Sequence, residues 1–136
     1  MPEKICIQPC LGINSAASTI GRQAAYLAHD ELIGRDKSDL GCAPALYADV
    51  EEDVDFIRED YVVAVESCGN RCANHLVAEK QGEVHATVMV EEVLAQAGIT
   101  LDGVPREHVE VDHPAVKAVA DEITRVSKAL LDGEES

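Results

Sequence analysis

A run of five residues, Tyr61-Val62-Val63-Ala64-Val65, constrains the fold more than any other part of the sequence. The run is rich in β-branched side chains and lacks an alternation of apolar and polar positions, which is the pattern of a strand buried on both faces. Strands of this kind belong to parallel sheets that are covered by helices on both sides. The run therefore predicts an α/β protein built around a parallel sheet.

Strand and helix patterns alternate along the rest of the chain. Residues 4–8 and 84–90 are expected to form two further strands. Five helices are expected: residues 14–32, 49–60, 70–80, a short helix that ends at Gly98, and a last helix from Asp112 to just before Gly133. Residues 34–41 look like a polar loop, and residues 42–46 like a short strand or turn that leads into a helix start.

This βαβα order predicts a three-layer α/β fold of the Rossmann/flavodoxin-like type, with a mainly parallel sheet and helices on both faces. At 136 residues the chain is long enough for one domain with its own core, which we place at residues 1–132, followed by a disordered tail at 133–136. Apolar residues at helical spacing mark the buried face of the first helix: Ile13, Ala17, Ile20, Ala24 and Leu27. Asn14 or Ser15 is expected to cap that helix and Asp112 the last one, with help from His113.

The charge balance excludes several classes of partner. The chain has 26 acidic against 11 basic side chains, a net charge of −15. Such a field repels phosphate backbones, so we expect no binding to nucleic acid or to anionic membranes. The acidity fits ordinary solubility or a salty cytoplasm, and the sequence does not choose between them. No signal-peptide core and no run of about 18 apolar residues is present, which favours a cytoplasmic protein.

Five cysteines in a reducing compartment favour metal binding or thiol chemistry over a disulfide framework. Cys10 follows the first strand and Cys68 follows the buried one. Ligands in parallel α/β folds bind at the carboxyl ends of the strands, so these two thiols should approach each other if their strands are neighbours. Cys6 lies inside the first strand and is expected to be a small buried apolar side chain.

The most informative local unit is Cys68-Gly69-Asn70-Arg71-Cys72. If a helix begins near Gly69, the two cysteines lie one turn apart and can face the same point. A helix N-terminus and the charge of Arg71 both favour thiolate, the form that binds metals or attacks sulfur. Cys42 stands in another turn, Gly41-Cys42-Ala43-Pro44.

On these motifs the chain resembles the DGC-domain family, small prokaryotic proteins for which four cysteines have been proposed as zinc ligands. The resemblance rests on Cys10-Leu11-Gly12, on Gly41-Cys42-Ala43-Pro44-Ala45, and on the segment from Val62 to Ala73 that contains the Cys68/Cys72 pair. The family's Asp-Gly-Cys motif appears here as Glu66-Ser67-Cys68. What the resemblance implies is a zinc site formed by Cys10, Cys42, Cys68 and Cys72.

The ligand chemistry agrees with that implication but leaves the metal open. Four thiolates suit a closed tetrahedral zinc site with Zn–S distances of about 2.3 Å. The same sulfurs suit an iron–sulfur cluster, and soft ligands do not separate zinc from iron or copper(I). His75, three residues after Cys72, is an alternative ligand. Whether the metal is structural, transferred or catalytic stays open, as do catalytic residues, enzyme activity and oligomeric state.

Other functions compete with metal binding. Thiol redox or sulfur transfer could use Cys68 and Cys72 with Cys10 as the attacking partner. A thiol phosphatase would need an arginine six residues after its cysteine, where this chain has Ala16 and Asn74. The simplest alternative is a domain whose cysteines are merely buried. Besides a metal ion, the partners left open are another protein and a small anion.

Overall fold

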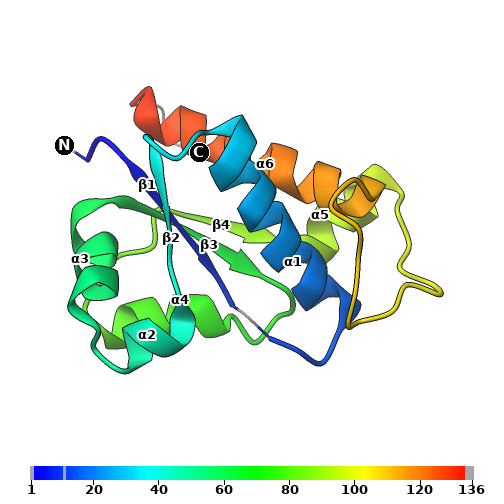
Figure 1. The fold of residues 1–136 in the computed structure, drawn as a ribbon, viewed down its shortest axis with the longest axis horizontal. Helices are drawn as coiled ribbons and strands as arrows, with labels where there is room; N and C mark the ends of the chain where they lie inside the picture. Colours follow the sequence, from blue (N-terminus) through cyan, green and yellow to red (C-terminus); the bar gives the residue numbers. More distant parts are fainter. Residues whose placement is uncertain (1, 11, 134–136) are drawn as a thin grey trace.

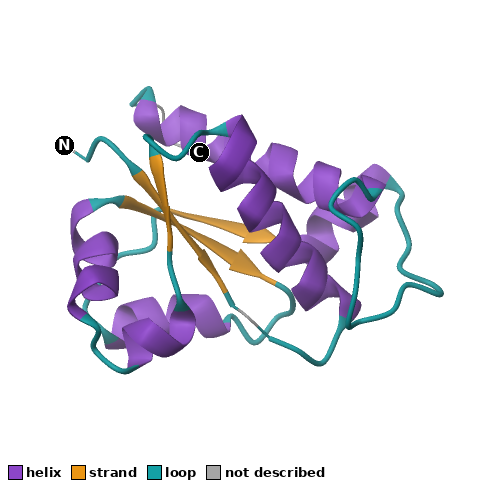
Figure 2. Ribbon diagram, in the orientation of Figure 1, coloured by secondary structure: helices purple, strands orange, loops and turns teal. Residues whose placement is uncertain are grey.

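The computed structural model describes residues 2–10 and 12–133, and its centre is a four-stranded parallel sheet. The strands are β1 (Ile5–Pro9), β2 (Ser38–Leu40), β3 (Tyr61–Glu66) and β4 (Ala86–Met89), in the order β2-β1-β3-β4. This order is the beginning of the flavodoxin-like arrangement, with its switch point between β1 and β3. The predicted three-layer α/β fold is confirmed (Figure 2).

Helices cover both faces of the sheet (Figure 1). On one side lie α1 (Ala16–Leu27), which continues as the π-helical turn η1 (Ala28–Leu32), α5 (Val90–Ala97) and α6 (Pro114–Leu131). On the other side lie α2 (Ala43–Tyr47), α3 (Glu51–Glu59) and α4 (Cys72–Glu79). The helices that follow β3 and β4 therefore fall on opposite faces, as in a doubly wound sheet.

Successive strand residues point to opposite faces, which produces two hydrophobic cores. Ile5 and Ile7 of β1 pack with Val63 and Val65 of β3 against α1, α5 and α6. On the other face of the sheet, Cys6 and Val62 pack in a second cluster with one residue from each of α2, α3 and α4; these residues are Leu46, Ile57 and Val77. Cys6 is fully buried, so its predicted role as a small apolar core side chain is confirmed.

Strand β2 lies where the sequence suggested a polar loop. It has only three residues, Ser38, Asp39 and Leu40, which pair with β1 at the sheet edge. Short edge strands with polar side chains carry almost no hydrophobic signal, and their hydrogen bonds to the neighbouring strand define them. Ser38 is buried there, and its hydroxyl lies 2.7 Å from Nδ1 of His29.

Helix ends also differ from expectation in two places. Ile13 is 82% exposed and lies outside α1, because Ser15 caps that helix by accepting from the amide of Ser18. At the start of α6 the cap is His113, not Asp112: the Nδ1 atom of His113 accepts from the amide of Ala115. The prediction that His113 helps to cap α6 is thus confirmed, and the prediction of Asp112 as the cap is wrong.

The C-terminal helix ends near its predicted limit, with Gly133 in a left-handed conformation just beyond it. Residues 134–136 of the predicted tail lie outside the described residues. Among the helices of the described ranges, none combines the length and apolar character needed to cross a membrane.

An acidic side chain is buried at the amino-terminal edge of the sheet, just before β3. Asp60 is 8% exposed, and its Oδ2 atom has no hydrogen-bond partner among the described residues. Burial raises the pKa of Asp60 to about 7, and the nearby charge of Asp39 acts in the same direction. The ion pair between Lys4 and Asp39, at 3.0 Å, relieves part of this repulsion.

Replacing Asp60 by Asn should therefore stabilise the protein at neutral and alkaline pH. Between the unfolded value near 4 and the folded value near 7 the native state holds a proton that the unfolded chain has lost, so stability falls as pH rises. We expect Asp60→Asn to gain about 1–2 kcal/mol over the unsubstituted protein at pH 8, and little at pH 4. Urea unfolding at several pH values measures the difference, and a gain that is equal at both pH values would contradict this assignment.

Candidate functional site

Three cysteines lie in a row along the carboxyl edge of the sheet. Cys10 directly follows β1, and its amide donates to the carbonyl of Val65 on β3 at 3.0 Å. Cys68 comes two residues after β3, and Cys42 comes two residues after β2. Since the strand order is β2-β1-β3, the order along the edge is Cys42, Cys10, Cys68. The expectation that the strands of Cys10 and Cys68 are neighbours is confirmed by the pairing of β1 with β3.

A cavity of about 310 Å³ opens at this edge, between the loop after β1 and the turn after β3. Three of the four predicted ligands line it: Cys10, Cys68 and Cys72. Cys10 is half-buried, while Cys68 and Cys72 are exposed. The other lining residues are Gly12, Ile13, Asn14, Ser18, Glu66, Ser67, Asn70 and Arg71.

Cys42 is not among the described residues that line this cavity. It is exposed and precedes the first turn of α2, where its amide donates to Oδ1 of Asp53 at 3.0 Å. The amide of Gly41 donates to the carbonyl of Ile7 at 2.8 Å, which fixes this turn beside β1. Cys42 therefore stands one strand away from Cys10 on the same edge, without reaching the shared cavity.

A chain of hydroxyl groups ends at the sulfur of Cys10. The hydroxyl of Ser18 on α1 donates to Oγ of Ser67 at 2.9 Å, and Oγ of Ser67 lies 3.2 Å from Sγ of Cys10. Because Ser67 accepts from Ser18, its own proton is available to Cys10. The hydroxyl of Ser67 is thus placed to donate a hydrogen bond to the sulfur of Cys10.

Glu66 lines the cavity, and the sequence pattern had given it no role beyond its place in the motif. Its side chain is 1% exposed at the end of β3, and its carboxylate accepts from the amides of Ala73 and Asn74 at 3.1 and 2.8 Å. The side-chain amide of Asn74 adds a third bond at 2.8 Å and also reaches Thr87 on β4. Glu66 thus ties the start of α4 to the sheet. Its signal in the sequence is an acid that directly ends a buried apolar strand.

The turn between Cys68 and Cys72 differs from the expected geometry. Helix α4 begins at Cys72 rather than near Gly69, so Cys68 lies in the turn that precedes the helix. Arg71 has a left-handed backbone with φ of 53°, which is uncommon for a residue with a side chain. Ser67, which replaces the glycine of the family motif, is not among the positive-φ residues of the described chain; it contributes its hydroxyl to the site.

The donor set suits a thiophilic metal, but its side chains have not converged. Among the described residues no group of three or more His, Cys, Asp or Glu side chains is already arranged to hold a metal ion. His75 is exposed on α4 and lies outside the lining of the cavity. Metal binding would therefore require the exposed side chains of Cys68 and Cys72 to turn toward Cys10.

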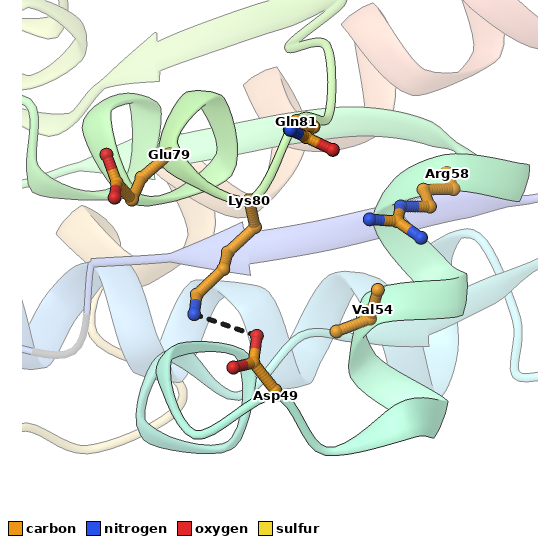
Figure 3. A pocket seen from close by; sticks show the side chains of 6 residues that line it. All are labelled: Asp49, Val54, Arg58, Glu79, Lys80 and Gln81. Carbon is orange, nitrogen blue, oxygen red and sulfur yellow. Dashed lines mark hydrogen bonds and ion pairs between the residues drawn. The ribbon is translucent and has the colours of Figure 1, made fainter.

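A second cavity, of about 220 Å³, lies between α3 and the end of α4, and no cysteine lines it (Figure 3). Its lining residues are Asp49, Val54, Arg58, Glu79, Lys80 and Gln81. Lys80 pairs with Asp49 at 2.8 Å and stands 5.4 Å from the ring centre of Tyr47. This cavity is stabilised by its own ion pair and is separate from the cysteine residues.

Fold and site together define a doubly wound α/β protein with a thiol-lined pocket at the switch point of its sheet. The family model of the DGC domain matches residues 6–123, and the chain belongs to the DGC domain family. The match includes all four strands except the first residue of β1, and it includes all the cysteines of the pocket. Neither the curated proteins nor the solved structures contain a match to the chain.

Removing the charge of Glu66 should weaken the whole fold. In Glu66→Gln the buried carboxylate is replaced by an amide whose NH₂ group faces N–H donors, so at least one charge-assisted hydrogen bond is lost. We expect the free energy of unfolding to fall by about 1.5–3 kcal/mol, measured by urea denaturation.

Glu79→Gln is the matched control, because Glu79 is an exposed acid on α4, the helix to which Glu66 is hydrogen-bonded. Its effect should stay within about 0.5 kcal/mol. Equal effects of the two substitutions would show that the Glu66 bonds do not contribute to stability.

Proposed function

We propose that the protein binds a thiophilic metal ion, zinc in the first place, at the carboxyl edge of its sheet. The observation that supports this function is that Cys10 and Cys68, which follow two neighbouring strands, line one cavity together with Cys72 at the start of α4. Thiolates are the preferred ligands of such metals.

The surroundings of the cysteines support metal binding. The hydroxyl of Ser67 lies within hydrogen-bond distance of the Cys10 sulfur, and Arg71 brings a positive charge to the same cavity. The exposure of Cys68 and Cys72 leaves their side chains room to rotate toward an incoming ion. The five cysteines are free thiols, which agrees with work in a reducing compartment, the cytoplasm in our proposal.

The number of sulfur ligands decides what the metal does. With Cys42 as the fourth ligand the site would be closed and would hold the edge of the sheet together. With Cys10, Cys68 and Cys72 alone it would keep an open position for a substrate or for transfer of the ion. The place of Cys42, outside the cavity, favours the open site.

Zinc binding can be tested on anaerobically purified protein by elemental analysis and visible absorption. We expect one zinc ion per chain and no colour. Substituting Cys10, Cys68 or Cys72 by Ala should weaken zinc binding by at least about 100-fold, because each removes a ligand. Cys6→Ala is the matched control and should bind zinc normally, since Cys6 lies in the core.

The variant Cys42→Ala separates the two kinds of site. A small effect indicates three sulfur ligands and an open position, and an effect as large as that of Cys10→Ala indicates four. A brown protein that contains iron and sulfide would show that the cysteines bind an iron–sulfur cluster instead of zinc. Normal zinc binding in all three pocket variants would contradict the proposed site.

Thiol–disulfide exchange is the second candidate, because the exposed Cys68 and Cys72 share their cavity with Cys10. In this reaction one thiolate attacks a substrate disulfide and expels the first substrate thiol, and the second thiol then attacks the mixed disulfide and expels the other substrate thiol. Two substrate thiols leave, and a Cys68–Cys72 disulfide forms. Incubation with oxidised glutathione followed by peptide mass spectrometry should then show that bond; modification of Cys42 as fast as of the pocket cysteines would contradict this function.

A further inference from the structure

We infer that the cysteine-lined pocket binds a small anionic molecule through Arg71, so that its oxyanion group lies beside the three thiols. The inference builds on the proposed function in one respect: it takes this pocket as the functional site. It does not depend on which metal, if any, the thiols hold.

Arg71 brings an uncompensated positive charge to a strongly negative protein. It lines the cavity between Asn70 and Cys72. Five of the eleven Lys and Arg side chains form ion pairs with acids, whereas Arg71 is one of the six that have no ion pair with an acid within residues 2–10 and 12–133. Of these six, Arg71 is the one that lines this cavity. In a chain with 26 acids and 11 bases, this charge is left available to a ligand.

The one acid among the described residues of the cavity does not neutralise Arg71. Both carboxylate oxygens of Glu66 accept hydrogen bonds from the start of α4, at Ala73 and Asn74. The carboxylate thereby occupies the amides that an anion could otherwise bind at this helix end. The guanidinium of Arg71 is consequently the cationic group that remains for an anion in this cavity.

The backbone around Arg71 is held in an unusual conformation. A left-handed backbone is unfavourable for a residue with a side chain and persists where its surroundings fix it. Here the turn is closed on one side by the amide of Arg71, which donates to the carbonyl of Cys68 at 3.4 Å, and on the other by the bonds of Glu66. Arg71 is thereby held in the turn that joins the two cysteines of the motif.

The remaining lining residues define the class of ligand. Asn14 and Asn70 carry side-chain amides that can donate to oxygen, and Ile13 supplies an exposed apolar edge. Ser18 is already hydrogen-bonded to Ser67, and Ser67 to Cys10. A cavity of about 310 Å³ with these groups fits a small organic carboxylate or another oxyanion whose opposite end reaches a thiol.

A pair of alkylating probes that differ in charge tests the inference. Iodoacetate carries a carboxylate and iodoacetamide is neutral, while both react alike: the thiolate sulfur forms a bond to the CH₂ carbon and iodide leaves. The reduced, metal-free protein is treated with each probe, and peptide mass spectrometry gives a rate for every cysteine. Cys42 serves as an internal control, because it is exposed on the same edge but outside the cavity.

The ratio of iodoacetate to iodoacetamide rates should be higher at Cys10, Cys68 and Cys72 than at Cys42. In Arg71→Gln this ratio should fall by about threefold or more at the pocket cysteines, as expected for one charge at a distance of several ångströms, and stay nearly constant at Cys42. Arg71→Lys should retain most of the preference. The control Arg58→Gln makes the same charge change in the other cavity and should leave every ratio unaltered.

An unchanged ratio in Arg71→Gln would overturn the inference, and so would an equal fall in Arg58→Gln, which would indicate the general field of the protein. Zinc stoichiometry is measured separately on the same variants. If the protein fails to bind zinc but keeps the Arg71-dependent ratio, only the metal proposal is contradicted. If it binds zinc but shows no Arg71-dependent ratio, only the anion site is contradicted.

Discussion

The pairing of β1 with β3 is the constraint on which the rest of the structure depends. Both strands are central and almost fully buried, so each must have neighbours on both sides and helices on both faces. Chain segments that are more than fifty residues apart thereby end at the same edge. The cavity, the row of cysteines and the switch point of the sheet all follow from this one parallel contact.

Buried polar groups then give the edge its shape. Glu66 ends β3 with a carboxylate that is enclosed by protein, and its three hydrogen-bond donors come from the first turn of α4 and from Asn74. The next residue, Ser67, connects α1 to Cys10 through its hydroxyl. A single dipeptide therefore holds two helices and one thiol in place, and the exposed Cys68 and Cys72 lie on a turn whose two ends are fixed.

The distribution of charge separates the two ends of the sheet. At the amino-terminal edge, burial and the nearby Asp39 raise the pKa of Asp60, and Lys4 is the compensating cation. At the carboxyl edge the one acid of the cavity is used by helix α4, and Arg71 is left available. With one acid and one base in its described lining, the pocket lacks the strong negative charge of the chain as a whole, which favours binding of an anion in so acidic a protein.

The sequence by itself determined the α/β class, the buried strand β3, most helices and the placement of Cys10 and Cys68 at strand ends, because these features depend on local patterns of apolar residues. It did not reveal β2, whose three residues, two of them polar, are a strand only through their bonds to β1. The sequence also placed the start of α4 too early, because the carboxylate that accepts from the first amides of this helix belongs to Glu66, which lies outside the helix. Which cysteines share a cavity was decided by strand order: Cys10, Cys68 and Cys72 meet around one space, and Cys42 stands one strand away.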